Sequence, residues 1–154
     1  MKLRVEMIES FFDKPAVTRA LDRGLRKALG KIGGIVRRIA RASIKNSPTP
    51  KASSAQGEPP LSHTGQLKDF IYYAYDAEQQ DVIIGPARLN TSLVMGRTVP
   101  ELLEFGGTAL RYIGRGRKRR AVPYKMAPRP YMSRALENYR PRIPKEFQGI
   151  IQPN

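Results

Sequence analysis

The residues that could carry out chemistry in this sequence are few. The only histidine, His63, stands between Ser62 and Thr64. A nucleophile of the Ser–His–acid type needs a rigid base that a third group orients. His63 lies instead in a stretch of Pro, Ser and Gly residues that offers no such group. The sequence therefore predicts no nucleophilic catalysis at this histidine.

Two glutamates, Glu101 and Glu104, are spaced three apart, as an acid/base pair or two metal ligands would be on a helix. No His or Asp follows at ligand spacing, and Glu101 fits a capping box with Thr98. We expect both to lie on a solvated helix face. The segment 114–116 has no phosphate-binding pattern, and without cysteine the chain has neither disulfides nor thiolate metal sites. We therefore expect no catalytic residue, no cofactor and no metal.

Charge is the strongest signal, because 28 Lys and Arg face only 13 Asp and Glu, a net charge of +15. Residues 14–45 hold ten bases and one acid, and residues 111–120 hold six bases and no acid, so these two segments supply the excess. The bases could form a solvated face, bind phosphates with a steep salt dependence, or contact acidic proteins. Six bases within ten residues favour a binding role for the second segment. It lacks the aromatic residues on which single-stranded nucleic acids stack.

The elements that would position these residues follow from periodicity. Apolar residues at spacings of three and four predict a long amphipathic helix over 14–45, with Asp13 as a plausible N-cap. Residues 3–12 fit a strand or a helical turn equally well. Residues 46–66, rich in Pro, Ser and Gly, predict an extended loop that is disordered alone. We expect it to extend along a neighbouring subunit and to order on contact.

Two hairpins and two helices complete the expected fold. The β-branched and aromatic runs predict hairpins over 70–84 and 108–124, the second with a basic tip at 114–120. A short helix, 100–105, should end at an αL glycine, and a last helix should cover 130–139. Pro141 and Pro144 should prevent its continuation. This order predicts one α+β domain over 1–140, with the long and the C-terminal helices packed on an antiparallel sheet, followed by a C-terminal tail over 141–154.

Three stretches of the chain, in this order and spacing, resemble the tail-completion family of long-tailed phages, which comprises head–tail joining or minor tail proteins of the neck. They are GEPPLSHTGQLKDFIYYAYD (57–76), VIIGPARLN with TVPELLEFGGT (82–90 and 98–108), and APRPYMSRALEN (127–138). The motif residues look architectural: Thr64, Gly65, Leu67, Glu104, Phe105, Gly106, Gly107, Arg129, Pro130 and Tyr131.

The resemblance implies a structural protein of the virion, assembled in the host cytoplasm. It implies a ring, commonly sixfold, between the head connector (stopper or adaptor) and the tail terminator or tube. It implies no catalytic role. No apolar run approaches the roughly 20 residues of a membrane helix, so we expect a soluble protein without a membrane partner. The alternative from charge alone is a basic nucleic-acid-binding protein.

Two groups of residues are predicted to make the contacts. A ring lined with such charge would grip a passing duplex, so we expect the tip to face an acidic protein, with contact to the nearby DNA as the alternative. The tip bases are Arg115, Arg117, Lys118, Arg119 and Arg120. The loop should contribute Pro59, Pro60 and Leu61. The basic helix face with Arg23, Arg37, Arg38 and Arg41 would lie on the outer or inter-ring side.

Overall fold

The computed structural model describes residues 14–87 and 97–150. The undecided segment 3–12, the proposed cap Asp13 and the end of the VIIGPARLN motif lie outside the described residues. The elements along the chain are α1 (Lys14–Ser43), α2 (Gln66–Asp69), β1 (Ile71–Asp76), β2 (Asp81–Pro86), α3 (Val99–Phe105), β3 (Gly107–Ile113), η1 (Gly116–Lys118), β4 (Arg120–Met126), α4 (Met132–Tyr139), η2 (Arg140–Arg142) and α5 (Ile143–Glu146). The α+β class is thus confirmed.

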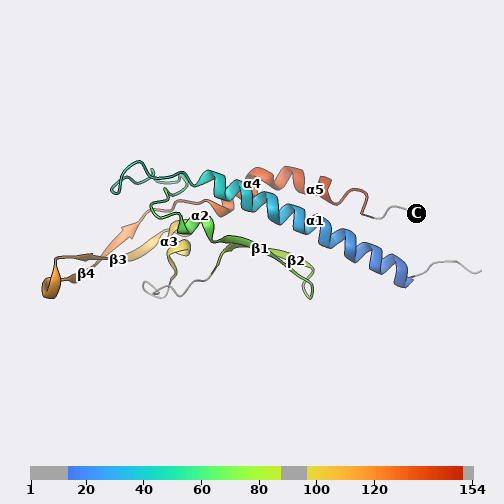
Figure 1. The fold of residues 1–154 in the computed structure, drawn as a ribbon, viewed down its shortest axis with the longest axis horizontal. Coiled ribbons are helices and arrows are strands. Elements are labelled where there is room, and N and C mark those ends of the chain that lie inside the picture. The colour runs from blue at the N-terminus through green and yellow to red at the C-terminus, as the bar shows by residue number, and fades with distance from the viewer. Residues whose placement is uncertain (1–13, 88–96, 151–154) are drawn as a thin grey trace, which may run out of the picture.

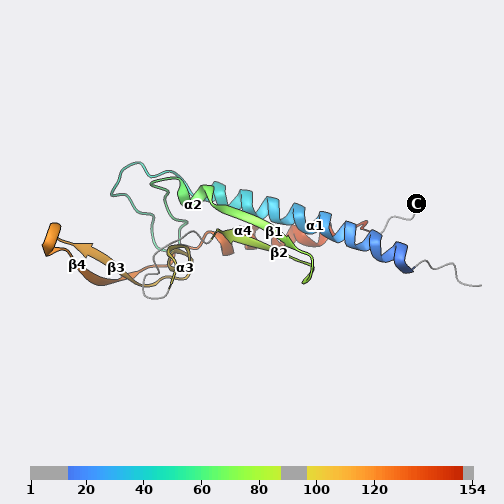
Figure 2. The same cartoon turned by 60° about the horizontal axis from the view of Figure 1, so that its bottom comes forward.

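The molecule is elongated, with α1 as its spine (Figure 1). The strands form two separate antiparallel hairpins, β1–β2 and β3–β4, rather than one sheet. The hairpin β1–β2 lies along α1, whereas β3–β4 projects from the opposite end of the molecule (Figure 2). Among the described residues, no helix is both long and apolar enough to cross a membrane.

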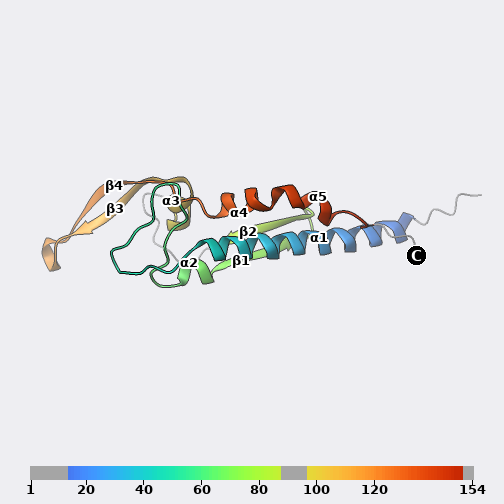
Figure 3. The ribbon, with the colours of Figure 1, turned by 90° about the horizontal axis from the view of Figure 1, so that it is seen from above.

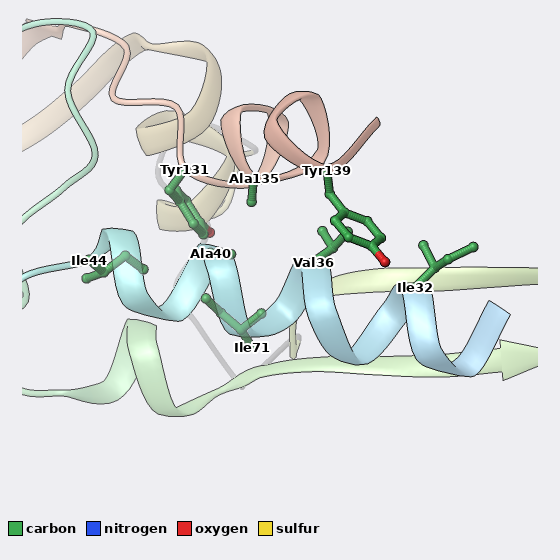
Figure 4. Close-up of a cluster of buried hydrophobic side chains, with 8 residues drawn as sticks. All are labelled: Ile32, Val36, Ala40, Ile44, Ile71, Tyr131, Ala135 and Tyr139. Carbon is green, nitrogen blue, oxygen red and sulfur yellow. The ribbon is translucent and has the colours of Figure 1, made fainter. Parts of the chain in front are cut away.

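The core is a narrow strip along α1. Helix α1 packs against β1 and β2 on one side and against α4 and α5 on another, as the view from above shows (Figure 3). Helices α4 and α5 therefore pack on α1, and α1 lies between them and the β1–β2 hairpin for most of the contact. The core side chains come from α1 and the residue after it, from β1, and from α4 and the residue before it (Figure 4): Ile32, Val36, Ala40, Ile44, Ile71, Tyr131, Ala135 and Tyr139.

Close packing between α1 and β1–β2 depends on Gly33. A Cβ atom added there would lie 2.6 Å from Cδ2 of Tyr73 and 2.8 Å from Cγ2 of Val82. The glycine thus lets the aromatic ring rest on the helix backbone. Gly30, one turn earlier, has no atom within 4 Å of such a Cβ. The two glycines, alike in the sequence, therefore differ in their structural role.

The short helix α3 begins as its sequence predicts. The side chain of Thr98 accepts a hydrogen bond from the amide of Glu101, and the Glu101 carboxylate accepts one from the amide of Thr98. The helix ends at Gly106, whose φ of 69° is positive as expected. Its ψ of −174° is extended rather than αL, so that the chain enters β3 directly. A Cβ at Gly106 would lie 2.9 Å from the carbonyl oxygen of Met126.

Part of the predicted C-terminal tail is helical. Helix α4 ends at Tyr139, but η2 and α5 follow at once, each with a proline in its first turn. A proline is tolerated there because the first amides of a helix have no intrahelical acceptor. Glu146 of α5 accepts a hydrogen bond of 2.6 Å from the Tyr139 hydroxyl and pairs with Lys31 of α1 at 2.7 Å. The expectation that the prolines leave a polar tail was therefore wrong for residues 141–146.

Candidate interaction surfaces

The most prominent surface is the basic arm, which we define as residues 107–126, the hairpin β3–β4 with its tip. The segment holds seven bases and no acid. Its strands pair in register from Gly107 with Met126 to Ile113 with Arg120. Gly114 and Gly116 have positive φ angles of 95° and 53°, and these permit the reversal at the tip.

The predicted tip residues lie together at the end of the arm. The side chains of Arg115, Arg117, Arg119 and Arg120 are exposed, whereas the side chain of Lys118 lies outside the described part of the structure. The guanidinium of Arg119 stands 4.6 Å from the ring centroid of Tyr112, a cation–π contact. None of the ion pairs in the described structure involves these arginines. The tip therefore offers several charges that can pair with an external anion.

The loop 46–66 is anchored within its own chain. Its two ends are joined where the Ser47 amide donates to the Ser62 carbonyl and the Ser62 amide to the Lys45 carbonyl, both at 2.8 Å. Its far side is tied to the segment before α4, because the Gly57 amide donates to the Pro128 carbonyl at 2.9 Å. The described structure therefore gives the loop contacts within its own chain, whereas the sequence predicted contacts with a neighbouring subunit.

Two arginines complete this anchorage of the loop. Nε of Arg129 donates to the Ser54 carbonyl at 3.2 Å, and the guanidinium of Arg134 contacts the Gly57 carbonyl and the Glu58 carboxylate. The loop residues predicted to make contacts differ in exposure: Pro60 is buried, and Pro59 and Leu61 are half-buried. Pro60 therefore belongs to the packed interior of the loop.

The motif residues 64–67 form the turn into α2. Gly65 has φ of 83°, its amide donates to the Ser62 hydroxyl, and its carbonyl accepts from the Asp69 amide. Leu67 packs against the core, while Thr64 and His63 are exposed. The positive φ at position 65 explains why this residue is glycine, since other residues adopt such an angle at a cost.

The carboxylate of Glu104 caps helix α4, 27 to 29 residues further along the chain. It accepts hydrogen bonds from the amides of Tyr131, Met132 and Ser133 at 2.8–3.1 Å and from the Ser133 hydroxyl at 2.6 Å. Burial alone would raise the pKa of Glu104, but these hydrogen bonds outweigh it and lower the pKa below its usual value. The expectation of a solvated carboxylate was therefore wrong for Glu104.

The other residues of the motif surround this cap. Tyr131 is fully buried, and burial together with the nearby Glu104 carboxylate raises the pKa of its hydroxyl. The amide of Arg129 donates to the Leu103 carbonyl at 2.6 Å. Phe105 is the exception, since 73% of it is exposed beside the root of the arm. Pro130 is half-buried and Gly107 has φ of 141°.

The basic face of α1 is partly used inside the molecule. Nε of Arg37 donates to the Ile71 carbonyl at 2.6 Å, and Arg41 pairs with Asp69 at 3.3 Å. These two arginines therefore hold β1 and α2 against α1. The sequence had instead placed them on the outer or inter-ring side of the assembly. Arg23 and Arg38 remain exposed as expected.

The described residues include no group of three or more His, Asp or Glu side chains placed to hold a metal ion. No family model matches the chain, and no curated protein or solved structure matches it either.

Proposed function

We propose that this chain is a structural protein of the phage neck, which completes the tail and joins it to the head connector as one subunit of a ring. One observation supports the proposal most directly. Parts of all three stretches that carry the resemblance, although separate in the sequence, meet at the root of the basic arm.

This junction is built from contacts described above. Glu104 of the second stretch caps α4 of the third, and Arg129 and Arg134 of the third stretch hold the loop in which the first stretch begins. The motifs therefore act as one architectural unit that fixes the arm relative to the body. A protein whose motif residues pack together and hold out a charged arm is better suited to assembly with other proteins than to catalysis.

The ring would lie between the tail terminator or tube and the stopper or adaptor of the connector. DNA passes nearby in such a particle, and the exposed arginines of the arm make nucleic-acid binding the second candidate. The proposed protein acts without catalysis, cofactor or metal and belongs to the virion.

Deletion of the encoding gene tests the proposal. Electron microscopy of the lysate should show full heads and finished tails that remain separate, and the protein supplied in trans should restore joined particles. Joined, infectious particles without the protein would contradict the proposal. A nucleic-acid-binding protein would instead retain duplex DNA at about 150 mM salt, with an affinity that falls steeply as salt rises.

A further inference from the structure

The two hairpins of this molecule carry opposite charges. The basic arm has seven bases and no acid, whereas residues 70–86, which include β1 and β2, have three acids and no base. Each hairpin has only two strands, so each leaves strand edges unpaired. A two-stranded hairpin is only marginally stable in water by itself, and β3–β4 projects from the body, whereas β1–β2 is packed on α1. Each hairpin still has a surface that a partner could cover.

The outer face of β1–β2 is largely apolar and exposed, with one contact from α1 where the Arg37 guanidinium lies 5.7 Å from the ring centroid of Tyr72. Side chains alternate along a strand, and Tyr73 and Val82 point to α1 at Gly33. The opposite face presents Tyr72, Ala74 and Ile83, and Ile83 is 62% exposed. Helix α1 therefore covers only one face of the β1–β2 hairpin. An apolar sheet face of this kind is typical of an interface.

Acidic residues border this outer face at the β1–β2 turn. Asp76 and Asp81 stand directly opposite each other in the strand register, an arrangement that destabilises a sheet when both are charged. One carboxylate oxygen of Asp76 accepts hydrogen bonds from the amides of Glu78 and Gln79. Among the described residues, Asp76, Glu78 and Asp81 take part in none of the ion pairs. A cationic partner would relieve the repulsion.

The basic arm offers the complementary chemistry. Besides its arginines it exposes aromatic side chains, with Tyr112 58% and Tyr124 39% exposed. Arginine and tyrosine together are the side chains most enriched at the centres of protein interfaces. The arm projects from one end of the described molecule, whereas the acidic turn lies beside the N-terminal half of α1, so the two are far apart within one chain (Figures 1 and 2).

We propose that the basic arm of one copy docks on the outer face of β1–β2 in the next copy, with its arginines against Asp76, Glu78 and Asp81. Such a contact is heterologous and generates a ring when the rotation closes. This ring is the one named in the proposed function, so the inference rests on the proposed function for the closed ring. Net charge weakens the contact but does not prevent it, because charges more than about 8 Å away are screened at physiological salt.

A second copy fits better than duplex DNA. DNA would engage the arginines of the arm, but it would leave the apolar face and the acidic turn of β1–β2 without a partner. One contact between copies satisfies both hairpins. Duplex DNA is therefore the competing outcome of the test.

Cross-linking tests the contact directly, because the chain has no cysteine and an introduced one is unique. We would mix Ala121→Cys, in the arm, with isotope-labelled Ala74→Cys, on the outer face, and treat the full-length proteins with a flexible bismaleimide at about 150 mM salt. We expect more mixed dimers than the two homodimers together. In the control, Ala42→Cys, at an exposed alanine of α1, replaces Ala74→Cys. Random pairing of equal amounts should then give as many mixed dimers as the two homodimers together.

Charge reversal provides a second, independent test. Reversal of Asp76, Glu78 and Asp81 to Lys in the Ala74→Cys protein should abolish the excess of mixed dimers. Reversal of Arg115, Arg117 and Arg119 to Glu in the Ala121→Cys partner should then restore it. Random proportions throughout, or an arm that binds a 20-base-pair duplex in place of the second copy, would overturn the inference.

These results separate the inference from the proposed function. Random cross-linking together with unjoined heads and tails in the deletion phage would reject the contact and keep the function. Specific cross-linking together with normal particles in the deletion phage would reject the function and keep the contact.

Discussion

At the scale of single residues, the most consequential side chain is Glu104, since its carboxylate supplies acceptors for the first amides of α4. We predict that Glu104→Gln destabilises the protein by about 1–3 kcal/mol, because a neutral amide accepts fewer and weaker hydrogen bonds. Urea unfolding at pH 7 measures the loss. Glu101→Gln is the matched control and should change little, since Gln also serves in a capping box.

The effect of Glu104 should depend on pH in one direction. Its pKa is lowered in the folded state, so its stabilising contribution is complete above the unfolded pKa and disappears as pH falls through the folded pKa. The difference between the wild type and Glu104→Gln should therefore shrink between pH 5 and pH 3, values near the ordinary glutamate pKa of about 4.3. A difference that stays constant over this interval would exclude the charged cap.

The same residue shows where sequence reasoning ends. The cap of α3 was predicted correctly because Thr98 and Glu101 are three residues apart and their chemistry is local. The role of Glu104 was missed because its partners lie 27 to 29 residues away. Its place in the E-F-G-G motif was the available signal, but spacing alone does not reveal a cap on a different helix.

At the scale of elements, the packing of α1 on β1–β2 gives a paired prediction. Gly33→Ala should destabilise the protein by about 1–3 kcal/mol, because the new methyl group would overlap Tyr73 and Val82. Gly30→Ala should stabilise it by roughly 0.5–1 kcal/mol, because its site is open and alanine is the better helix former. Thermal and urea unfolding of both variants check the pair, and equal effects would contradict this packing.

The loop 46–66 gives a prediction for hydrogen exchange in the free protein. The amides of Ser47, Gly57 and Ser62 donate hydrogen bonds within the chain, so they should exchange more slowly than those of Lys51 and Ser53. Arg129→Ala should speed exchange at Gly57 by loosening the anchorage. Uniformly fast exchange across the loop would show instead that order requires a neighbouring subunit.

The elements were predicted better than their contacts. The long helix and both hairpins follow from local periodicity and turn residues, and these patterns were sufficient. The anchorage of the loop depends on Arg129 and Arg134, whose partners are about 75 residues away. The helical turns after Tyr139 were missed because Pro141 and Pro144 were treated as breakers, although each lies in a first turn.

At the scale of the whole molecule, a net charge of +15 opposes spontaneous assembly. We predict that the purified protein is a monomer or a loose oligomer, and that a stable ring forms only on a tail or connector template. The contact between copies proposed above is weak in solution and strengthened by the high local concentration on the template. Light scattering at physiological salt checks this, and a stable hexamer without partners would refute it.

Replacement of the five tip bases, residues 115 and 117–120, by Ser tests the role of the arm in the particle. If the arm contacts protein, as proposed, joining of heads and tails should be defective while DNA is retained in the heads. Replacement of the exposed Arg19, Arg23, Lys27, Arg38 and Lys45 by Gln removes the same charge from α1 and the segment just after it, and should leave joining intact. Normal joining with early DNA leakage would show that the tip contacts DNA.

The attachment of the arm has a mechanical consequence. Its seven-residue strands reach about 23 Å from their root, and the root contains two consecutive glycines, Gly106 and Gly107, with positive φ. A change of about 10° in the direction of the arm would displace its tip by roughly 4 Å without bending either strand. The hydrogen bonds of Glu104 and Arg129 beside the root therefore also set the position of a tip that lies a full strand length away.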